Sequence, residues 1–153
     1  MGYNIAIDGP AGAGKSTIAK LVAKELGFIY VDTGAMYRGL AVHFLKKGIV
    51  PGEVEKIEAA CEDAKVELGY ENGVQQVYLN GENITGELRE EAVGNMASVS
   101  SANPEVRAHL LKLQRNLAAE NNVVMDGRDI GTTILPNAEV KICLLYTSPS
   151  PRD

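Results

Sequence analysis

A glycine-rich segment that contains a lysine and a serine stands close to the start of the chain. Residues 9–17 fit the pattern G-x-x-x-x-G-K-S. Glycines in such a loop let backbone N–H groups close around a polyphosphate, and the following helix directs its positive end toward the same anion. Lys15 can reach the β and γ phosphates of a nucleoside triphosphate, and the Ser16 hydroxyl can ligate the magnesium that accompanies it. The residues predicted to bind this ligand are Gly9, Pro10, Ala11, Gly12, Ala13, Gly14, Lys15, Ser16 and Thr17.

The sequence around this segment predicts the elements that such a loop requires. Residues 4–8 form a short apolar run, which predicts a buried strand ahead of the loop. Behind the loop, apolar residues recur at helical spacing until Gly27, a residue suited to the end of a helix. The alternative is a glycine-rich turn that binds nothing, but the complete strand, loop and helix favour a phosphate site. The recurring apolar residues are Ile18, Leu21, Val22 and Leu26.

Strands and helices continue to alternate along the chain. Further buried strands are predicted at residues 28–31, 123–125 and 140–145. One helix is predicted to end at Gly48, and another begins at Asn103-Pro104, an N-cap followed by an N1 proline. We therefore predict an α/β fold of the P-loop NTPase type, with a parallel sheet flanked by helices. The apolar face of the later helix comprises Val106, Leu110, Leu113 and Leu117.

The segment between residues 66 and 84 has a different pattern. Two Asn-Gly pairs, at positions 72–73 and 80–81, separate runs rich in residues that favour strands. Two such turns indicate a small antiparallel sheet, which we interpret as an insert outside the main sheet. From about residue 86 to about residue 101 a further helix is predicted.

The composition and charge of the chain limit the kinds of molecule that it is expected to bind. The chain has 153 residues and a net charge of −5, and residues 41–105 carry five Lys/Arg against twelve Asp/Glu. This balance argues against a nucleic-acid partner and suits a protein that binds small anions. No apolar run is long enough to span a membrane and no secretory signal is seen. Cys61 and Cys143 lack metal-site spacing, so reduced thiols and a cytoplasmic setting are expected, and His43 and His109 are expected to be structural or surface residues.

Charged residues follow two of the predicted strands. Residues 32–34 end one strand, with Tyr37 and Arg38 on the first turn of the next helix, and residues 126–129 end another. Because the carboxyl ends of parallel strands gather at one edge, Arg38 and Arg128 can converge on an acceptor phosphate. A solvated surface charge is the alternative for each arginine by itself.

Two carboxylates also follow apolar strands. Asp8 and Asp126 can organise magnesium through water, or they can cap the turns beside them. Both alternatives stay open at the level of sequence.

Together these motifs resemble those of the bacterial cytidylate kinases, which are nucleoside monophosphate kinases. The segments that carry the resemblance are residues 9–17, 32–38, 95–98, 104–107 and 126–132, within a match from about residue 3 to about residue 144. The resemblance implies phosphoryl transfer from ATP, with Mg²⁺, to CMP or dCMP. It implies Lys15, Arg38 and Arg128 as the catalytic residues. It also implies a core over residues 1–145, in which about residues 60–86 form the insert on the monophosphate side.

The resemblance further implies how an acceptor nucleotide is held. Arg38 and Arg128 would hold its phosphate, and Thr33 and Tyr37 would help to position it. Three residues match the family's cytosine-reading positions. Arg107 can donate to O2 and N3 of the base, while Asp129 and Ser98 can accept from the 4-amino group. Without the resemblance, Ser98 would be interpreted as a hydroxyl bonded to the backbone of its own helix. Arg107 would be interpreted as a solvated charge on the first turn of a helix.

The chain departs from the family after residue 144. The family continues there with a helix, an arginine-bearing lid, a further core strand and a closing helix, and these are missing from the sequence. Residues 146–153 contain two prolines and no apolar period, so a disordered or foreign tail is expected. The last strand would then be an exposed edge.

Three alternatives to an active (d)CMP kinase are open. The first is a kinase for another small acceptor, such as AMP or a sugar acid. The second is a GTP-dependent switch protein, which the missing N-K-x-D motif disfavours. The third is an inactive or weakly nucleotide-binding fragment, an alternative of nearly the same weight as the active enzyme. We expect a monomer whose partners are ATP and CMP or dCMP, with no nucleic acid and no membrane.

Overall fold

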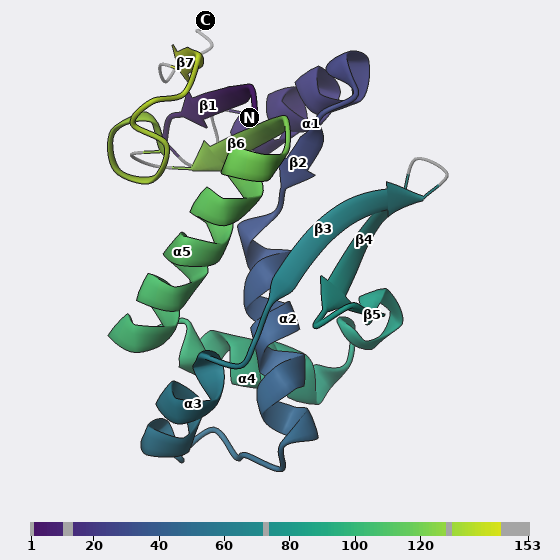
Figure 1. Cartoon of the computed structure of the whole chain (residues 1–153), viewed down its shortest axis with the longest axis vertical. Helices are drawn as coiled ribbons and strands as arrows, with labels where there is room; N and C mark the ends of the chain where they lie inside the picture. Colours follow the sequence, from purple (N-terminus) through teal and green to yellow (C-terminus); the bar gives the residue numbers. More distant parts are fainter. Residues whose placement is uncertain (1, 11–13, 72–73, 128–129, 145–153) are drawn as a thin grey trace, which may run out of the picture. The chain divides into compact units, whose positions relative to one another are not determined.

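The computed structural model describes residues 2–10, 14–71, 74–127 and 130–144 (Figure 1). The chain forms two compact units. The first comprises Met1–Val31 and Gln114–Asp153, and the second comprises Asp32–Leu113. The chain therefore returns to the first unit within helix α5 (Pro104–Glu120). The predicted turn at residues 72–73 and the predicted tail at residues 146–153 lie outside the described residues.

The first unit is built on a four-stranded parallel sheet. Its strands are β1 (Asn4–Asp8), β2 (Ile29–Val31), β6 (Val123–Gly127) and β7 (Val140–Cys143). They lie in the order β2–β6–β1–β7, and every pair is parallel. The carboxyl ends of β1 and β6 therefore meet at one edge, where Asp8 lies opposite Gly127. The predicted parallel sheet is confirmed, although β2 begins and β7 ends within the predicted limits.

Helix α1 (Lys15–Leu26) packs against this sheet through small side chains. Ala19 and Ala23 are buried with Ile5 and Val124 of the sheet. Short side chains let a helix backbone approach a sheet closely, which explains why they form the contact. The helix and its end at Gly27, whose φ is 71°, are as predicted. Of the four periodic apolar residues, however, only Val22 is half-buried and packs against this cluster. Ile18, Leu21 and Leu26 are exposed.

The second unit combines helices with a small antiparallel sheet. Its elements are α2 (Thr33–Lys46), α3 (Val54–Cys61), β3 (Val66–Glu71), β4 (Val74–Leu79), β5 (Glu82–Asn83), the 3₁₀ turn η1 (Thr85–Glu87) and α4 (Glu91–Ser100). Helix α2 runs along β3 and β4 (Figure 1). A Cβ at Gly39 would lie 3.0 Å from Cγ1 of Val66, so any other residue there would push against this valine side chain. Met36, Leu40 and Phe44 of α2 are fully buried and form the centre of this core.

The predicted antiparallel sheet is confirmed in strands β3, β4 and β5. Val66 of β3 lies opposite Leu79 of β4. The turn between β4 and β5 has φ values of 50° at Asn80 and 87° at Gly81. Two successive left-handed residues form the tight turn that suits the twist of a hairpin, and asparagine followed by glycine adopts it most readily.

The helix predicted from about residue 86 begins later, at Glu91. The preceding residues stay attached to the sheet, because the Thr85 hydroxyl accepts the N–H of Val77 at 2.9 Å. The start of α5 is as predicted, since the Asn103 side chain accepts the N–H of Glu105 at 2.8 Å. The predicted apolar face of α5 is buried at all four positions, Val106, Leu110, Leu113 and Leu117.

Candidate functional site

In the first unit, the glycine-rich segment leads from β1 into the start of α1. Gly14 has a φ of 83° and occupies the N-cap position of α1 without a side-chain cap. The Lys15 amine donates to the Pro10 carbonyl at 3.2 Å, which closes the loop. No acidic residue occupies the first turn of α1, Lys15–Ile18. The positive end of this helix is therefore available to an anion. Residues 11–13 lie outside the described residues, so their role stays a prediction.

The residue types at this helix start suit a metal bound together with a phosphate. Ser16 and Thr17 are exposed. The Ser16 hydroxyl is an oxygen ligand of the type that Mg²⁺ prefers, and Mg²⁺ usually completes its shell with phosphates and waters. Among the described residues, no three His, Cys, Asp or Glu side chains are grouped so as to hold a metal.

The carboxylate that precedes the loop is engaged by backbone groups. The oxygens of Asp8 accept the N–H groups of Ile130 and Gly131, the latter at 2.9 Å. A Cβ at Gly131 would lie 3.2 Å from the nearer Asp8 oxygen, so glycine allows this approach. Asp126 accepts a hydrogen bond from the Tyr30 hydroxyl at 2.8 Å. The contacts of Asp8 with backbone N–H groups favour the capping role for that residue, whereas the bond of Asp126 to a side chain of β2 supports neither of its two roles.

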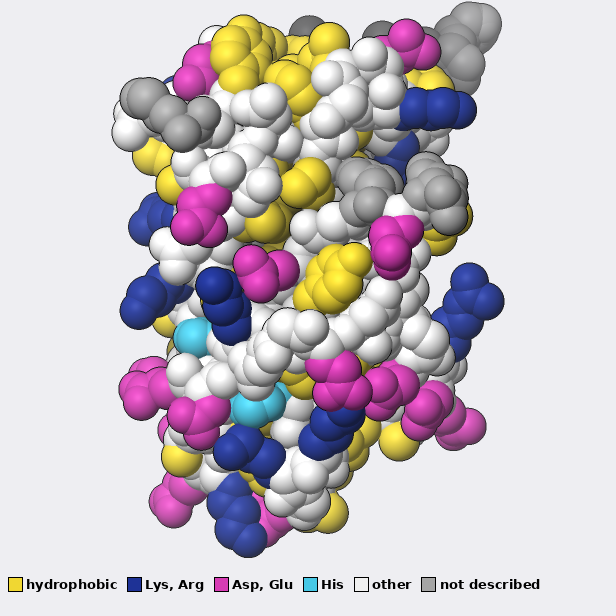
Figure 2. Space-filling view, turned by 45° about the vertical axis from the view of Figure 1, so that its right-hand side comes forward, with side chains coloured by type: hydrophobic (Ala, Val, Ile, Leu, Met, Phe, Trp, Pro, Cys, Tyr) yellow, Lys and Arg dark blue, Asp and Glu magenta, His cyan; other side chains and the backbone are white. Residues whose placement is uncertain are grey.

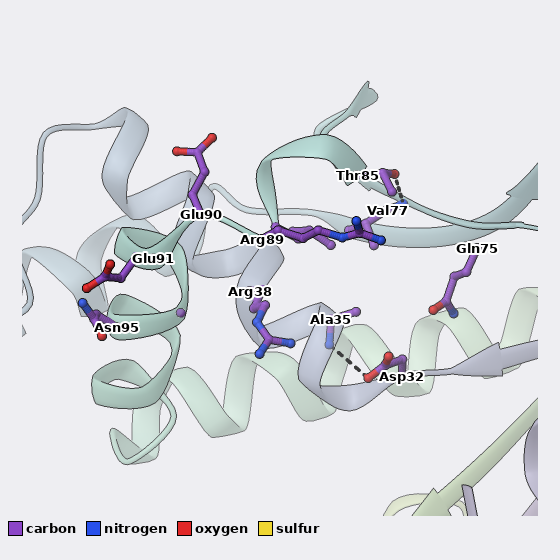
Figure 3. A pocket seen from close by; sticks show the side chains of 12 residues that line it. Asp32, Ala35, Arg38, Gln75, Val77, Thr85, Arg89, Glu90, Glu91 and Asn95 are labelled. Atoms are coloured by element: carbon purple, nitrogen blue, oxygen red, sulfur yellow. Dashed lines mark hydrogen bonds between the residues drawn. The ribbon is translucent and has the colours of Figure 1, made fainter. Parts of the chain in front are cut away.

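The second unit contains a cavity of about 630 Å³ that brings Arg38 together with segments from three other elements. Figure 3 shows the Arg38 side chain, which comes from α2 and lines this space, with Asp32 at the start of the same helix. An Asp32 oxygen accepts the N–H of Ala35 at 3.1 Å and caps α2. The sequence placed Tyr37 and Arg38 on the first turn of this helix, but α2 begins at Thr33, so both residues lie on its second turn. The remaining walls come from β4, η1 and the N-terminal part of α4.

Tyr37 and Arg107, two predicted acceptor-site residues, are in direct contact. The Arg107 guanidinium donates a hydrogen bond to the Tyr37 hydroxyl. Burial raises the pKa of Tyr37 above its ordinary value, and the charge and hydrogen bond of Arg107 oppose that shift. Tyr37 is therefore a neutral acceptor for Arg107 near pH 7. Arg107 stands on the first turn of α5 and is exposed, but it is not a purely solvated charge.

The other predicted acceptor-site residues differ in their surroundings. Thr33 is the half-buried first residue of α2. Ser98 is exposed on α4. The bond to the helix backbone considered for Ser98 is made instead by Ser100, whose hydroxyl donates to the Met96 carbonyl at 2.7 Å. Arg128 and Asp129 lie outside the described residues, so the pairing of Arg38 with Arg128 stays a prediction.

Sequence reasoning assigned only Arg38 of the cavity's polar lining to the site and did not assign, among others, Gln75, Arg89 and Asn95. Gln75 belongs to β4, Asn95 to α4, and Arg89 to the turn between η1 and α4. Arg89 is the single cationic residue in the acidic run at positions 87–91. That isolated charge was the one available signal.

The distribution of charge over the surface is mixed. Acidic and basic side chains are interspersed over the visible face (Figure 2). Such a face suits small ligands bound in pockets better than an extended polyanion. In the described part of the chain, none of the helices combines the length and the apolar character needed to cross a lipid bilayer.

The fold and the loop define the class of the protein. A parallel α/β sheet whose first strand leads through a glycine-rich loop into a helix that begins Lys-Ser is the arrangement of the P-loop proteins. Within that class, the chain belongs to the cytidylate kinase family, because the family model "Cytidylate kinase" matches residues 5–152. The resemblance predicted from the motifs is thereby confirmed.

Curated relatives agree with this assignment. The chain is 50% identical over 145 residues to a cytidylate kinase of Caldicellulosiruptor saccharolyticus, with 95% of this chain and 64% of the relative covered. It is 51% identical over 141 residues to a cytidylate kinase of Ligilactobacillus salivarius, with 92% of this chain and 63% of the relative covered. The chain therefore spans less than two thirds of the length of these relatives.

Proposed function

We propose that this chain provides the nucleotide-binding parts of a kinase that transfers a phosphoryl group from ATP to CMP or dCMP, giving CDP or dCDP. The observation that carries the proposal is the cavity lined by Arg38 in a member of this family. Its volume, about 630 Å³, lies in the range of pockets that hold small molecules. A guanidinium group in such a cavity suits a phosphate monoester.

The donor phosphates are assigned to residues 9–17. Lys15 binds the β and γ phosphates, and the uncapped start of α1 directs backbone N–H groups toward them. When bound with the nucleotide and Ser16, Mg²⁺ neutralises charge on the β and γ oxygens. The lysine and the loop hold the γ-phosphoryl group in a fixed position, which removes much of the entropic part of the barrier.

The acceptor phosphate is assigned to Arg38 and Arg128. An oxygen of the acceptor phosphate attacks the γ-phosphorus in line. A new P–O bond forms as the bond from the γ-phosphorus to the β–γ bridging oxygen breaks, and ADP leaves with that electron pair. No covalent intermediate on the protein and no strong base is required. The two arginines position the acceptor and balance the charge of the transferring group.

The base is assigned to Arg107, Asp129 and Ser98. Arg107 donates to O2 and N3 of cytosine, while Asp129 and Ser98 accept from its 4-amino group. In uracil, position 3 is a donor and position 4 a carbonyl, so both contacts would be mispaired. A mispaired buried polar group costs about 1–3 kcal/mol, or about 5- to 150-fold in kcat/KM. UMP should therefore be the poorer substrate.

An assay that couples ADP formation to a spectrophotometric readout tests the proposal. CMP, dCMP, UMP and AMP are offered to this chain and to a version completed at its C-terminus with the segment of a relative. We expect transfer to CMP and dCMP ahead of the other two. Faster turnover of AMP would replace the proposal with a kinase for another acceptor, and equal rates for UMP and CMP would remove the base-reading roles. If only the completed chain is active, this chain is a nucleotide-binding fragment.

The proposed setting follows from the same chemistry. ATP and CMP or dCMP are the proposed partners, with Mg²⁺ accompanying ATP, and nucleic acid and membrane have no part in the reaction. Both cysteines are free thiols, Cys61 buried and Cys143 exposed, which accords with the reducing cytoplasm. A monomer is proposed. Sedimentation of the purified chain, with and without CMP, tests this state.

A further inference from the structure

Arg89 brings a second guanidinium group to the cavity that Arg38 lines. Arg38 comes from α2, whereas Arg89 comes from the turn between η1 and α4. Figure 3 shows the Arg89 side chain extended, with its guanidinium group turned away from Glu90 and Glu91 and toward the side formed by β4. We propose that Arg89 is a further binding residue of the acceptor site, where it holds the acceptor phosphate together with Arg38. This inference rests on the proposed function.

The carboxylates that line the cavity are associated with helix starts rather than with the arginines. Asp32 caps α2 through its hydrogen bond to the N–H of Ala35. Glu90 and Glu91 stand at the N-cap and first position of α4, where a negative charge interacts favourably with the helix dipole. These side chains therefore have a structural explanation of their own.

The two arginines have no such explanation. Within residues 32–71 and 74–113, neither Arg38 nor Arg89 forms a hydrogen bond or an ion pair. Both arginines are exposed, and an anion that both of them reach would balance the two positive charges. A single surface arginine would need no partner, but two that line the same cavity from different elements suit a shared anionic ligand.

A phosphate monoester matches what the pair offers. Each guanidinium presents parallel N–H donors that fit two oxygens of one phosphate, and a monoester carries up to two negative charges near neutral pH. Arg38 is held on a helix, while Arg89 is held in the turn between η1 and α4. A nucleoside without the phosphate would gain nothing from Arg89.

Calorimetric titration tests this inference by comparing CMP with cytidine. The ligands are titrated into the full chain, Arg89→Gln, Arg38→Gln and the control Lys65→Gln, at low and at moderate salt. Lys65 is an exposed cation of the second unit that does not line the cavity. We expect Arg89→Gln to weaken CMP binding about 10-fold, to reduce its salt dependence and to leave cytidine binding unchanged. Lys65→Gln should bind both ligands like the parent chain.

The outcomes separate this inference from the proposed function. If Arg89→Gln binds CMP like the parent while Arg38→Gln is weakened, the role of Arg89 is overturned and the proposed function stands. If the parent binds no CMP, both are overturned. Arg89→Lys keeps the charge but loses the fork, and an intermediate loss of CMP affinity is expected. If Arg89→Gln fails to fold, Arg89→Met, which keeps the apolar stem and removes the charge, takes its place, and parent-like CMP affinity in that variant would overturn the inference.

Discussion

Arg107 of helix α5 donates a hydrogen bond to the hydroxyl of Tyr37 in helix α2. The two residues lie far apart in the sequence, yet each was assigned separately to the acceptor nucleotide. Tyr37 stands next to Arg38, so the bond connects the helix that carries the phosphate-binding arginine with the proposed reader of the base. A change at Tyr37 should therefore be felt at the base as well as at the phosphate.

Tyr37→Phe removes this hydrogen bond while keeping the ring. Arg107 then loses an anchor, so we expect the ratio of kcat/KM for CMP over UMP to fall about 5-fold, as for the loss of one hydrogen bond of about 1 kcal/mol. Tyr78→Phe, in β4 and outside the cavity, is the matched control. An unchanged CMP-to-UMP ratio in Tyr37→Phe would show that the bond has no part in reading the base.

Lys15→Ala should remove phosphoryl transfer. The amine is the cation assigned to the β and γ phosphates, and loss of one such electrostatic contact typically lowers kcat by about 10²- to 10³-fold. Lys24→Ala, an exposed lysine in the last turn of the same helix, should keep full activity. The measurement is the coupled assay, with the chain completed at its C-terminus where needed. Parent-like activity in Lys15→Ala would mean that the loop has been misassigned.

Asp8→Ala should lower the stability of the first unit. The substitution leaves the N–H groups of Ile130 and Gly131 without their acceptor, and such part-buried groups together are worth about 2 kcal/mol. Urea unfolding measures the loss as a lower midpoint. Asp63→Ala removes an exposed ion pair with Lys47 and should change the free energy of unfolding by less than about 1 kcal/mol. Equal effects of the two variants would contradict the structural role of Asp8.

The stability of the second unit should fall in mild acid because of His43. Burial is the largest cause that lowers the pKa of His43, its hydrogen bond to the Ala60 carbonyl opposes this, and Lys47 adds a smaller lowering. The folded chain therefore binds a proton at His43 less readily than the unfolded chain does. Stability is fully present above about pH 6.5, the ordinary value, and is lost as the pH falls toward the pKa of the folded state.

Thermal unfolding between pH 5 and pH 8 tests this pH dependence. His43→Gln retains a side chain that can donate to Ala60 but cannot titrate, so its midpoint should vary less with pH than that of the parent chain. His109→Gln is the control, because His109 makes a comparable contact with the Ala64 carbonyl. The assignment to His43 is wrong if the parent and His43→Gln lose stability in parallel.

The two cysteines should differ sharply in reactivity. Burial raises the pKa of the Cys61 thiol to about 11, whereas Cys143 is exposed. Because the thiolate is the reactive species, a thiol reagent at pH 8 should modify Cys143 within minutes and Cys61 only after unfolding. Mass spectrometry of the native chain should thus find one label. Cys143→Ser should then take up none until denaturant is added, and rapid labelling of that variant would contradict the burial of Cys61.

Several features could be predicted because they depend on neighbours in the sequence. The strand ahead of the loop, the end of α1 at Gly27 and the turn at residues 80–81 were all predicted. Each rests on local backbone preferences or on apolar periodicity, and such preferences act over a few residues. The glycine-rich motif and the family resemblance were readable for the same reason.

Other features required the tertiary structure. The apolar periodicity correctly predicted that α1 is a helix, but it did not predict which face of the helix is buried. The contact with the sheet is made through Ala19 and Ala23, while Leu21 is 57% exposed. The later start of α4 was also missed, because the hydrogen bond between Thr85 and Val77 binds the preceding turn to the sheet. Packing decides both points, and no local pattern records it.

The sequence by itself determined which side chains can handle phosphate: the loop lysine, Arg38 and the residues of the family motifs. Only the tertiary structure decided that Asp8 accepts the backbone N–H groups of residues 130–131. It also decided that Arg107 forms a hydrogen bond with Tyr37 and that Arg89 and Arg38 line one cavity. The reason is physical. The chemistry of a residue follows from its type. Its partners are brought to it when the apolar faces of helices and strands are buried against each other, and this burial joins segments that are distant in the chain.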